Sequence, residues 1–364
     1  MFSIIERYIA REIFQTLIGV SLVLLLIFIS NRLVRYLADA AAGDIPSNLI
    51  FTLLALKSIS YFITLLPFAL YLAILLVLGR LYRDNEMVAI NATGMGIGKL
   101  YKIVILLALP LTLFAGWISL KVGPSTSATE YKIIDNAERK LEVTGLSAGR
   151  FREIRGGERI IYVEEISPDR KRTKNVFIYA RLSNRDVVFS AAKARIEFNQ
   201  IGERYLVLED GYRYDGVPGK ADYRMTRYKE HAFKLISKFK ANARRKRDSV
   251  PTERLLISKN PRDQAELQWR ISLPLSAFFL ALFAIPIGKV NPRQGRYGKL
   301  AVAILVSVFY FALLSLAQTK VAKGELSPAI GLWWIHGLVF LLTLLLTARQ
   351  LGFRWLGRRF LGRA

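Results

Sequence analysis

The segment Arg159-Ile160-Ile161-Tyr162-Val163 alternates its side chains like a half-buried β-strand, and Val176-Phe177-Ile178-Tyr179-Ala180 repeats the pattern. Similar short β-branched and aromatic runs occupy residues 187–189, 194–198 and 205–208. Turn signals such as Asp210-Gly211 occur among these runs, and together they predict an antiparallel all-β domain, either a sandwich or an open jelly roll. The runs lie in a polar middle segment, residues 123–269, that divides the chain.

Three long apolar segments lie on each side of this middle segment, and a helix needs about 20 such residues to cross a bilayer. The six predicted spans are residues 16–36, 49–78, 103–122, 271–287, 300–318 and 330–348. The predicted fold is therefore a membrane α-helical bundle of six transmembrane helices with an inserted antiparallel all-β jellyroll domain.

The domain organisation follows from this division. We expect residues 1–122 to hold an amphipathic interfacial helix at residues 1–15, the first three spans and a short cytoplasmic helix near residues 81–92. Residues 123–269 are expected to form the β domain with helical and basic linkers, and residues 125–141 have the pattern of the helix that leads into it. Residues 270–364 hold the last three spans and a basic tail.

The chain has 364 residues and a formal net charge of +25, which suggests anionic partners or the basic cytoplasmic loops of a membrane protein. Basic residues concentrate in the short loops at residues 80–102 and 289–299 and in the tail at residues 349–363, whereas the loop at residues 38–48 is acidic. The positive-inside rule then places both termini in the cytoplasm and the middle segment outside, because long domains translocate largely regardless of charge. Nucleic-acid binding is not expected in this orientation.

No pattern in the sequence predicts catalysis. Cysteine is absent, and the two histidines, His231 and His336, belong to no metal or acid–base motif. The run Gly94-Met95-Gly96-Ile97-Gly98-Lys99 lacks the spacing of a phosphate-binding loop, and Leu100 stands where that loop requires Ser or Thr. We expect His336 to be a packing or interfacial residue. The chain is predicted not to be an enzyme and to hold no cofactor or metal of its own.

Arg32 and Arg35 lie three residues apart near the outer end of the first span. A charged side chain in a span is costly unless it reaches the headgroups or meets a partner. The two arginines therefore either extend to the outer headgroups or bind an anionic substrate, for which Arg offers directional, bidentate contacts to phosphate. Residue chemistry alone leaves both alternatives open. Lys57, near the outer end of the second span, is a weaker candidate of the same kind.

Two further segments have alternative interpretations. Glu86 lies in the short helix near residues 81–92, which could dock a soluble cytoplasmic partner or be an ordinary surface helix. The basic run at residues 234–247 could contact anionic headgroups where the chain returns to the membrane, or could be a solvated linker.

Taken together, these features resemble the lipopolysaccharide export permease family (LptF/LptG), and within it the LptF type. The resemblance covers essentially the whole chain, and the residues that carry it are Arg7-Tyr8, Arg11-Glu12, Gly43-Asp44-Ile45-Pro46, Asn48-Leu49, Leu66-Pro67, Leu78-Gly79-Arg80-Leu81-Tyr82, Glu86, Gly123-Pro124, Glu266-Leu267, Trp269-Arg270 and Asn291-Pro292-Arg293-Gln294-Gly295-Arg296. The inserted segment matches in pattern more than in residues.

The resemblance implies a permease subunit of an ABC transporter in the bacterial inner membrane, with its β-jellyroll in the periplasm. Such a subunit pairs with an LptG-type permease and a cytoplasmic LptB-type ATPase dimer, and extracts lipopolysaccharide from the outer leaflet. A single-span LptC-type protein then receives the lipid through a matching jellyroll.

By the same resemblance, Arg32 and Arg35 match the basic pair that contacts the phosphates of the lipid, and Glu86 matches the acidic residue of the coupling helix. Lys57 and the basic run have no counterpart in this family pattern. Two alternatives to transport remain: a membrane-anchored enzyme that modifies envelope lipids, and a periplasmic sensor or scaffold. The lack of an acid–base or metal cluster argues against the enzyme, and a scaffold would need no coupling helix.

Overall fold

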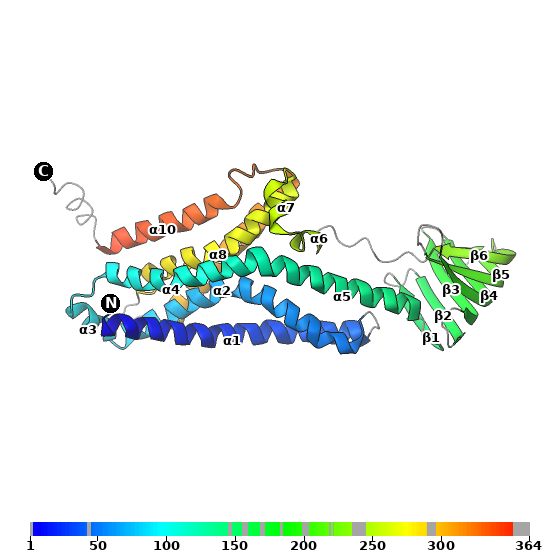
Figure 1. The fold of residues 1–364 in the computed structure, drawn as a ribbon, viewed down its shortest axis with the longest axis horizontal. Helices are drawn as coiled ribbons and strands as arrows, with labels where there is room; N and C mark the ends of the chain where they lie inside the picture. The colour runs from blue at the N-terminus through cyan, green and yellow to red at the C-terminus, as the bar shows by residue number, and fades with distance from the viewer. Residues whose placement is uncertain are drawn as a thin grey trace. The chain divides into compact units, whose positions relative to one another are not determined.

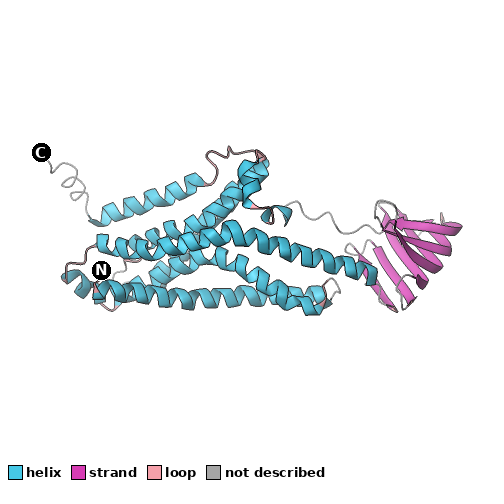
Figure 2. Ribbon diagram, viewed as in Figure 1, coloured by secondary structure: helices cyan, strands magenta, loops and turns pink. Residues whose placement is uncertain are grey.

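The computed structural model describes residues 3–41, 45–144, 148–154, 159–167, 172–182, 185–198, 204–217, 220, 222–234, 245–289 and 296–351. Figures 1 and 2 show two groups of helices in the chain, separated in sequence by a β-sheet. The chain divides into two compact units, one made of Met1–Tyr36, Ile50–Tyr131 and Ala243–Ala364, the other of Leu37–Leu49 and Lys132–Asn242. The first unit is the helical bundle, and the second contains the sheet.

Among the described residues, six helical stretches are long and apolar enough to cross a membrane: Ile4–Ala41, Ser47–Arg83, Ile97–Ala137, Pro261–Ile287, Ala301–Lys323 and Trp333–Leu351. The helices that make them up are α1 (Ile4–Ala41), η1 (Ser47–Leu49), α2 (Ile50–Arg83), α4 (Ile97–Trp117), η2 (Ile118–Val122), α5 (Gly123–Thr144), α8 (Pro261–Ile287), α9 (Arg296–Lys323) and α10 (Trp333–Leu351). The short helices are α3 (Glu86–Ala92), α6 (Arg245–Asp248) and α7 (Thr252–Ile257). The predicted fold class, a six-span helical bundle with an inserted antiparallel β domain, is confirmed.

The first helix differs from the prediction. The expected interfacial helix at residues 1–15 and the span at residues 16–36 form one continuous helix, α1. No proline lies between Ile4 and Ala41, so nothing in the sequence ends the helix between these two parts. Ile9, Ile13 and Leu17, four residues apart, are the buried apolar positions of its first half.

The third span continues without interruption into the helix that leads to the sheet, since α4, η2 and α5 follow one another directly. The segment η2 is a π-helix, in which the N–H of Gly123 donates to the carbonyl of Ile118, five residues earlier. Pro124 has no N–H for the carbonyl of Leu120 and would crowd it in a regular α-helix. The wider π turn relieves this contact, and the helix predicted at residues 125–141 is confirmed as part of α5.

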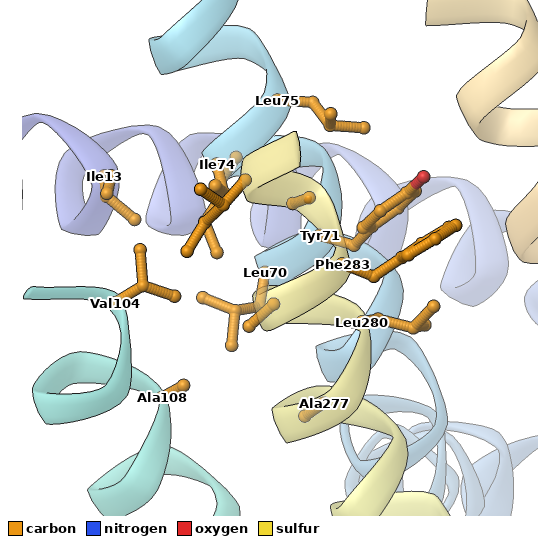
Figure 3. Close-up of a cluster of buried hydrophobic side chains, with 14 of the residues drawn as sticks. Ile13, Leu70, Tyr71, Ile74, Leu75, Val104, Ala108, Ala277, Leu280 and Phe283 are labelled. Carbon is orange, nitrogen blue, oxygen red and sulfur yellow. The ribbon is translucent and has the colours of Figure 1, made fainter. Parts of the chain in front are cut away.

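Helix α8 is the centre of the bundle and packs against α2, α4, α9 and α10. Its buried side includes Ala277, Ala281 and Ala284, small residues that let neighbouring backbones approach closely. Figure 3 shows this core, in which Leu70 and Ile74 of α2 lie beside residues of α8. Because lipid tails are as apolar as leucine, such close packing is the main force that can hold the spans together.

The second unit contains a single sheet whose six antiparallel strands are paired in chain order. The strands are β1 (Arg150–Ile154), β2 (Arg159–Ile166), β3 (Arg172–Leu182), β4 (Arg185–Phe198), β5 (Arg204–Gly216) and β6 (Arg224–Lys234). The sheet is open, rather than a sandwich of two sheets. The runs predicted at residues 187–189 and 194–198 belong to one strand, β4, and the sequence reading missed β1 and β6 because polar residues dominate these edge strands.

Partway along the strands of the sheet, the buried positions switch between odd-numbered and even-numbered residues. Asn175 in β3 and Asp210 in β5 have φ of 47° and 48°, in the left-handed region. In β3 the buried positions change from Thr173 to Val176 and Ile178 across Asn175. In β5, Leu206, Val207 and Leu208 are buried before Asp210, and Gly211 is buried after it. The prediction that Asp210-Gly211 forms a turn between strands is therefore wrong. These two residues form a kink inside β5 that keeps the same face of the sheet buried.

Gly211 also lies beneath a neighbouring aromatic side chain. The hydroxyl of Tyr228 on β6 donates to the carbonyl of Ser190 on β4, at 3.1 Å, across the strand that holds Gly211. A Cβ at position 211 would lie 2.2 Å from the carbonyl oxygen of Ser190 and 2.4 Å from the Tyr228 hydroxyl. Only glycine fits this crossing.

We therefore expect Gly211→Ala to destabilise the β domain by about 2 kcal/mol or more, because overpacking a site fixed by backbone atoms forces the strands apart. The measurement is the rate of limited proteolysis of the purified protein within residues 148–234. Lys229→Ala, an exposed change on the adjacent strand, is the control and should leave the rate unchanged. Equal rates for the two variants would contradict the prediction.

Candidate functional site

Arg32, the predicted phosphate-binding residue, lies in a polar cluster inside the helical unit. Its guanidinium stacks over the ring of Tyr36, 4.2 Å from the ring centroid. The Tyr36 hydroxyl donates to Oε1 of Glu130 at 3.2 Å, and Nζ of Lys57 lies 3.4 Å from Oε2 of the same carboxylate. We call these four residues, from α1, α2 and α5, the Glu130 cluster.

The burial of the cluster is uneven. Glu130 and Tyr36 are buried, whereas the Lys57 side chain is 24% exposed and Arg32 is half-buried. A buried carboxylate is tolerated only where cations and donors compensate it, which Lys57 and Tyr36 do for Glu130. Arg32, by contrast, forms no ion pair with a carboxylate of the described residues, and its buried Nε has no hydrogen-bond partner there. The cluster therefore combines a satisfied acid with a cation that interacts with Tyr36 and keeps one buried donor, Nε, without a hydrogen-bond partner among the described residues.

The other two predicted basic contacts have different surroundings. Arg35 is exposed, and within the described ranges no hydrogen bond or ion pair joins it to another residue. The structure thus brings Arg32 and Lys57 to one carboxylate but leaves Arg35 outside the cluster. Lys57, for which headgroup contact and substrate contact were both open, forms an ion pair with Glu130. The sequence did not indicate Glu130, which follows a polar stretch beyond the predicted third span.

Glu86 begins α3, directly after a left-handed turn at Asn85, where φ is 59°. The short helix predicted near residues 81–92 is confirmed but begins later than expected, because α2 continues to Arg83. The hydroxyl of Tyr8 on α1 donates to Oε2 of Glu86 at 2.9 Å. On α3, Met87 and Ile90 are buried, whereas Val88 is 64% exposed. An apolar side chain thus faces outward on a helix that is anchored by its other side.

Arg80 extends this contact toward the first helix. Its guanidinium donates to the Tyr8 hydroxyl at 3.1 Å and pairs with Glu12 of α1 at 2.9 Å. The first helix and the start of α3 are therefore joined through one tyrosine and one arginine. Each contact is exposed and individually weak, so the group holds these helices together as a set.

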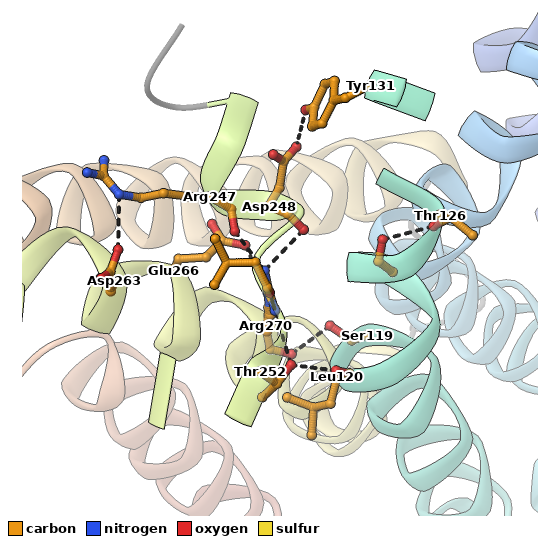
Figure 4. Close-up of polar contacts among 12 residues, drawn as sticks. Ser119, Leu120, Thr126, Tyr131, Arg247, Asp248, Thr252, Asp263, Glu266 and Arg270 are labelled. Atoms are coloured by element: carbon orange, nitrogen blue, oxygen red, sulfur yellow. Dashed lines mark hydrogen bonds and ion pairs between the residues drawn. The ribbon is translucent and has the colours of Figure 1, made fainter. Parts of the chain in front are cut away.

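Arg270 is the centre of a second polar network, shown in Figure 4. Its Nε lies 3.0 Å from Oε1 of Glu266, and one terminal nitrogen donates to the carbonyl of Val250 at 2.9 Å and the hydroxyl of Thr252 at 3.0 Å. The other donates to the carbonyls of Arg247 and Asp248, at 2.9 and 3.1 Å. A guanidinium has five N–H donors, and each has a partner here. We call Arg270 with these partners the arginine clasp.

The clasp also reaches the π-helical segment of the third span. The Thr252 hydroxyl donates to the carbonyl of Leu120, the acceptor that Pro124 leaves without an N–H, and the Ser119 hydroxyl donates to the carbonyl of Arg270 at 2.9 Å. Tyr131 of α5 donates to Asp248 at 2.7 Å. Both chain segments that connect the helical unit to the inserted domain are thus fixed beside one buried arginine.

The basic run predicted at residues 234–247 is described only at its ends. Residues 235–244 lie outside the described residues, and Lys234 ends β6. The Arg247 side chain forms an ion pair with Asp263 at 3.1 Å, and its backbone carbonyl accepts a hydrogen bond from Arg270. Asp248 follows it, and burial raises the pKa of this carboxyl, while the hydrogen bond from Tyr131 opposes the shift. At its described end, then, the run belongs to a packed network rather than to a solvated linker.

The two histidines are packed residues in this structure. His336 is buried in α10, with its Nδ1 2.8 Å from the Tyr310 hydroxyl, which in turn donates to Ser276 of α8 at 2.9 Å. In the sheet, His231 stacks on Phe189, and burial lowers the pKa of its imidazole. Within the described ranges, no group of three or more His, Cys, Asp and Glu residues is arranged to hold a metal ion.

Comparison with known proteins places this chain in a family. The model of the lipopolysaccharide export system permease LptF/LptG matches residues 7–349, a range that covers the sheet and all or nearly all of each of the six spans. The chain belongs to this family. It is 29% identical over 346 residues to the lipopolysaccharide export system permease protein LptF of Escherichia coli K12 and to that of Shigella flexneri, covering 94% of each chain.

These relatives confirm the LptF type that the motifs indicated, and membership of a permease family agrees with a multi-pass membrane protein. The clasp gives one family motif a structural role. Trp269-Arg270 and Glu266-Leu267 were recognised as motifs from the sequence, but their spacing did not reveal that Arg270 holds the linkers of the inserted domain.

We expect Arg270→Lys to lower the free energy of unfolding by about 3 kcal/mol or more, because lysine keeps the charge but leaves several buried carbonyls without donors. The thermal midpoint of the purified protein in detergent should fall by about 5–10 °C. Arg262→Lys makes the same change at an exposed position of α8 and should leave the midpoint unchanged. A similar midpoint for both variants would show that the clasp does not stabilise the bundle.

Proposed function

We propose that this chain is the permease subunit of an ABC transporter that extracts lipopolysaccharide from the outer leaflet of the inner membrane. It passes the lipid to a periplasmic jellyroll bridge toward the outer membrane, and a separate cytoplasmic ATPase supplies the energy. The observation that carries this proposal is the family match across residues 7–349, which spans the helices and the sheet alike.

The geometry of Arg32 supports the substrate step. Lipopolysaccharide is a large amphiphile with several negative charges, so its extraction needs apolar helix surfaces and a few cations near headgroup depth. Arg32 is a half-buried cation without an ion-pair partner in the described part of the chain, and its guanidinium lies over the ring of Tyr36. Arginine held in this way binds phosphate through directional hydrogen bonds. Arg35, which is exposed, remains a candidate for a second, more peripheral contact.

Energy for the cycle is proposed to enter through α3. The sequence holds no nucleotide-binding motif, so ATP would be bound by the partner ATPase and this chain would need no cofactor. Met87 and Ile90 anchor α3 to the bundle, while Val88 and Glu86 lie on the side available to a partner. Movement of the ATPase would then shift α3, and the contacts of Tyr8 and Arg80 would carry the shift to α1.

The remaining partners follow from the family and the sheet. An LptG-type permease would form a heterodimer with this chain, and an LptB-type ATPase dimer would bind on the cytoplasmic side. An LptC-type single-span protein would receive the lipid. An open antiparallel sheet leaves backbone donors and acceptors along its edge strands, β1 and β6, and such edges pair readily with another sheet. With both termini cytoplasmic, this sheet would lie in the periplasm.

Glu86→Ala should weaken co-purification of the ATPase with this chain, because a partly buried, hydrogen-bonded carboxylate at the start of α3 is lost. The measurement is the amount of ATPase retained on the tagged permease complex. Asp84→Ala removes a neighbouring carboxylate that does not belong to α3 and serves as the matched control. Unchanged assembly and ATP-driven export in Glu86→Ala would exclude α3 as the coupling helix and would favour a scaffold.

An alkaline phosphatase inserted at Lys220 should be active, because that enzyme matures outside the cytoplasm and the positive-inside rule places the sheet there. A second fusion at Lys99, in the first turn of α4, should be inactive. The reverse pair of activities would overturn the proposed orientation of the whole chain.

A further inference from the structure

Two cations and one acid make up the charged part of the Glu130 cluster, and the acid is the most buried of the three. We propose that Glu130 is the resident counter-anion of an anion site formed by Arg32, Tyr36 and Lys57, and that the phosphate of a lipid headgroup takes its place when substrate binds. This inference rests on the proposed function, and it assigns roles to Tyr36 and Glu130, for which the sequence indicated none.

The contacts of Glu130 are long for a buried carboxylate. Tyr36 donates to it at 3.2 Å and Lys57 lies 3.4 Å away, whereas charge-assisted bonds usually measure about 2.7–2.9 Å. The contacts of Arg270, which span 2.9–3.1 Å, show what a saturated network looks like in the same unit. Glu130 therefore neutralises the charge of Lys57 and accepts from Tyr36, but through long contacts. Contacts of this kind are suited to exchange.

The exposure of the cluster indicates where an anion would enter. The Glu130 side chain is only 4% exposed, whereas that of Lys57 is 24% exposed. The cations are thus reachable while the acid lies behind them. Without Glu130, Lys57 would be a partly desolvated cation with no partner in the cluster, which is costly. The carboxylate keeps the site formed while it is empty.

A phosphate matches the hydrogen-bond donors of the site better than a carboxylate does. Its three oxygens can accept from Arg32, Lys57 and Tyr36 together, and its charge is about −1.5 to −2. Arg32, whose Nε has no hydrogen-bond partner among the described residues, gains the most from its arrival. When the lipid leaves, Lys57 and Tyr36 return to Glu130. Glu130 thereby limits how tightly the site holds its substrate, and a transporter must release as well as bind.

The test uses the full permease complex with a photo-crosslinking residue at Phe28, one turn before Arg32 on α1, and quantifies the adduct with lipopolysaccharide before and after ATP. The same residue at Leu341 of α10 is the background control. Glu130→Gln should raise the adduct by about fivefold, as expected for the loss of one competing charge, and the adduct should persist after ATP. Glu130→Asp, which keeps the charge, should restore the wild-type value.

A charge exchange separates binding from folding. The double variant Lys57→Glu with Glu130→Lys keeps an ion pair but puts the acid at the exposed position, so its thermal midpoint should stay close to the wild-type value. Its adduct should fall at least about tenfold, because a cationic contact to phosphate is replaced by a like charge.

The outcomes distinguish the two proposals. If the amount of adduct in Glu130→Gln equals that of the wild-type protein, or if the charge-exchange variant keeps the wild-type amount, the role of Glu130 is overturned. The proposal of lipid extraction would then still stand. A wild-type adduct no greater than that at Leu341 overturns both the site and the proposed substrate.

Discussion

The buried guanidinium of Arg270 is the interaction on which the arrangement of this chain depends. A charge in the interior of a membrane bundle is tolerated only when its donors are satisfied, and Arg270 satisfies them mainly with backbone carbonyls of the segment that returns from the sheet. That segment is therefore fixed before the fourth span begins. Through Thr252 and Ser119 the same residue supports the π-helical segment of the third span. One arginine thus fixes the bundle ends of both linkers of the inserted domain.

Arg32 and Arg270 show two uses of the same side chain. Arg270 has a partner for every donor, so it has no capacity left for a ligand and its role is structural. Arg32 stacks on Tyr36 and has no carboxylate partner in the described residues, so it can still bind an anion. Lys57 and Glu130 stand between these extremes, as an ion pair with long contacts. The degree of hydrogen-bond satisfaction, rather than burial or charge alone, separates the two roles.

Contacts at the other end of the bundle give the proposed coupling a physical route. Glu86 on α3 and Glu12 on α1 are joined through Tyr8 and Arg80. The same helix, α1, holds Arg32 further along its length, and nothing in its sequence breaks it between these residues. A displacement of α3 would therefore reach the anion site through one unbroken helix. Hydrophobic packing of Ile9, Ile13 and Leu17 against the core resists such a movement in the first half of α1.

The sequence by itself determined the six spans, the inserted antiparallel domain and the family, because apolar length, strand alternation and local motifs are properties of short segments. It also made Arg32 and Glu86 candidates for substrate contact and coupling, since a charge in a span and an acid on a short loop helix stand out from their neighbours. Only the tertiary structure decided that Glu130 meets Lys57 and Tyr36, which lie 73 and 94 residues away along the chain. Likewise, Asp210-Gly211 is a kink rather than a turn, where Tyr228 crosses Gly211 to reach Ser190. Arg270 is a clasp because the chain packs it against carbonyls of Arg247 and Val250, which lie 23 and 20 residues away. Such contacts depend on how distant segments pack, and no periodicity within one segment records them.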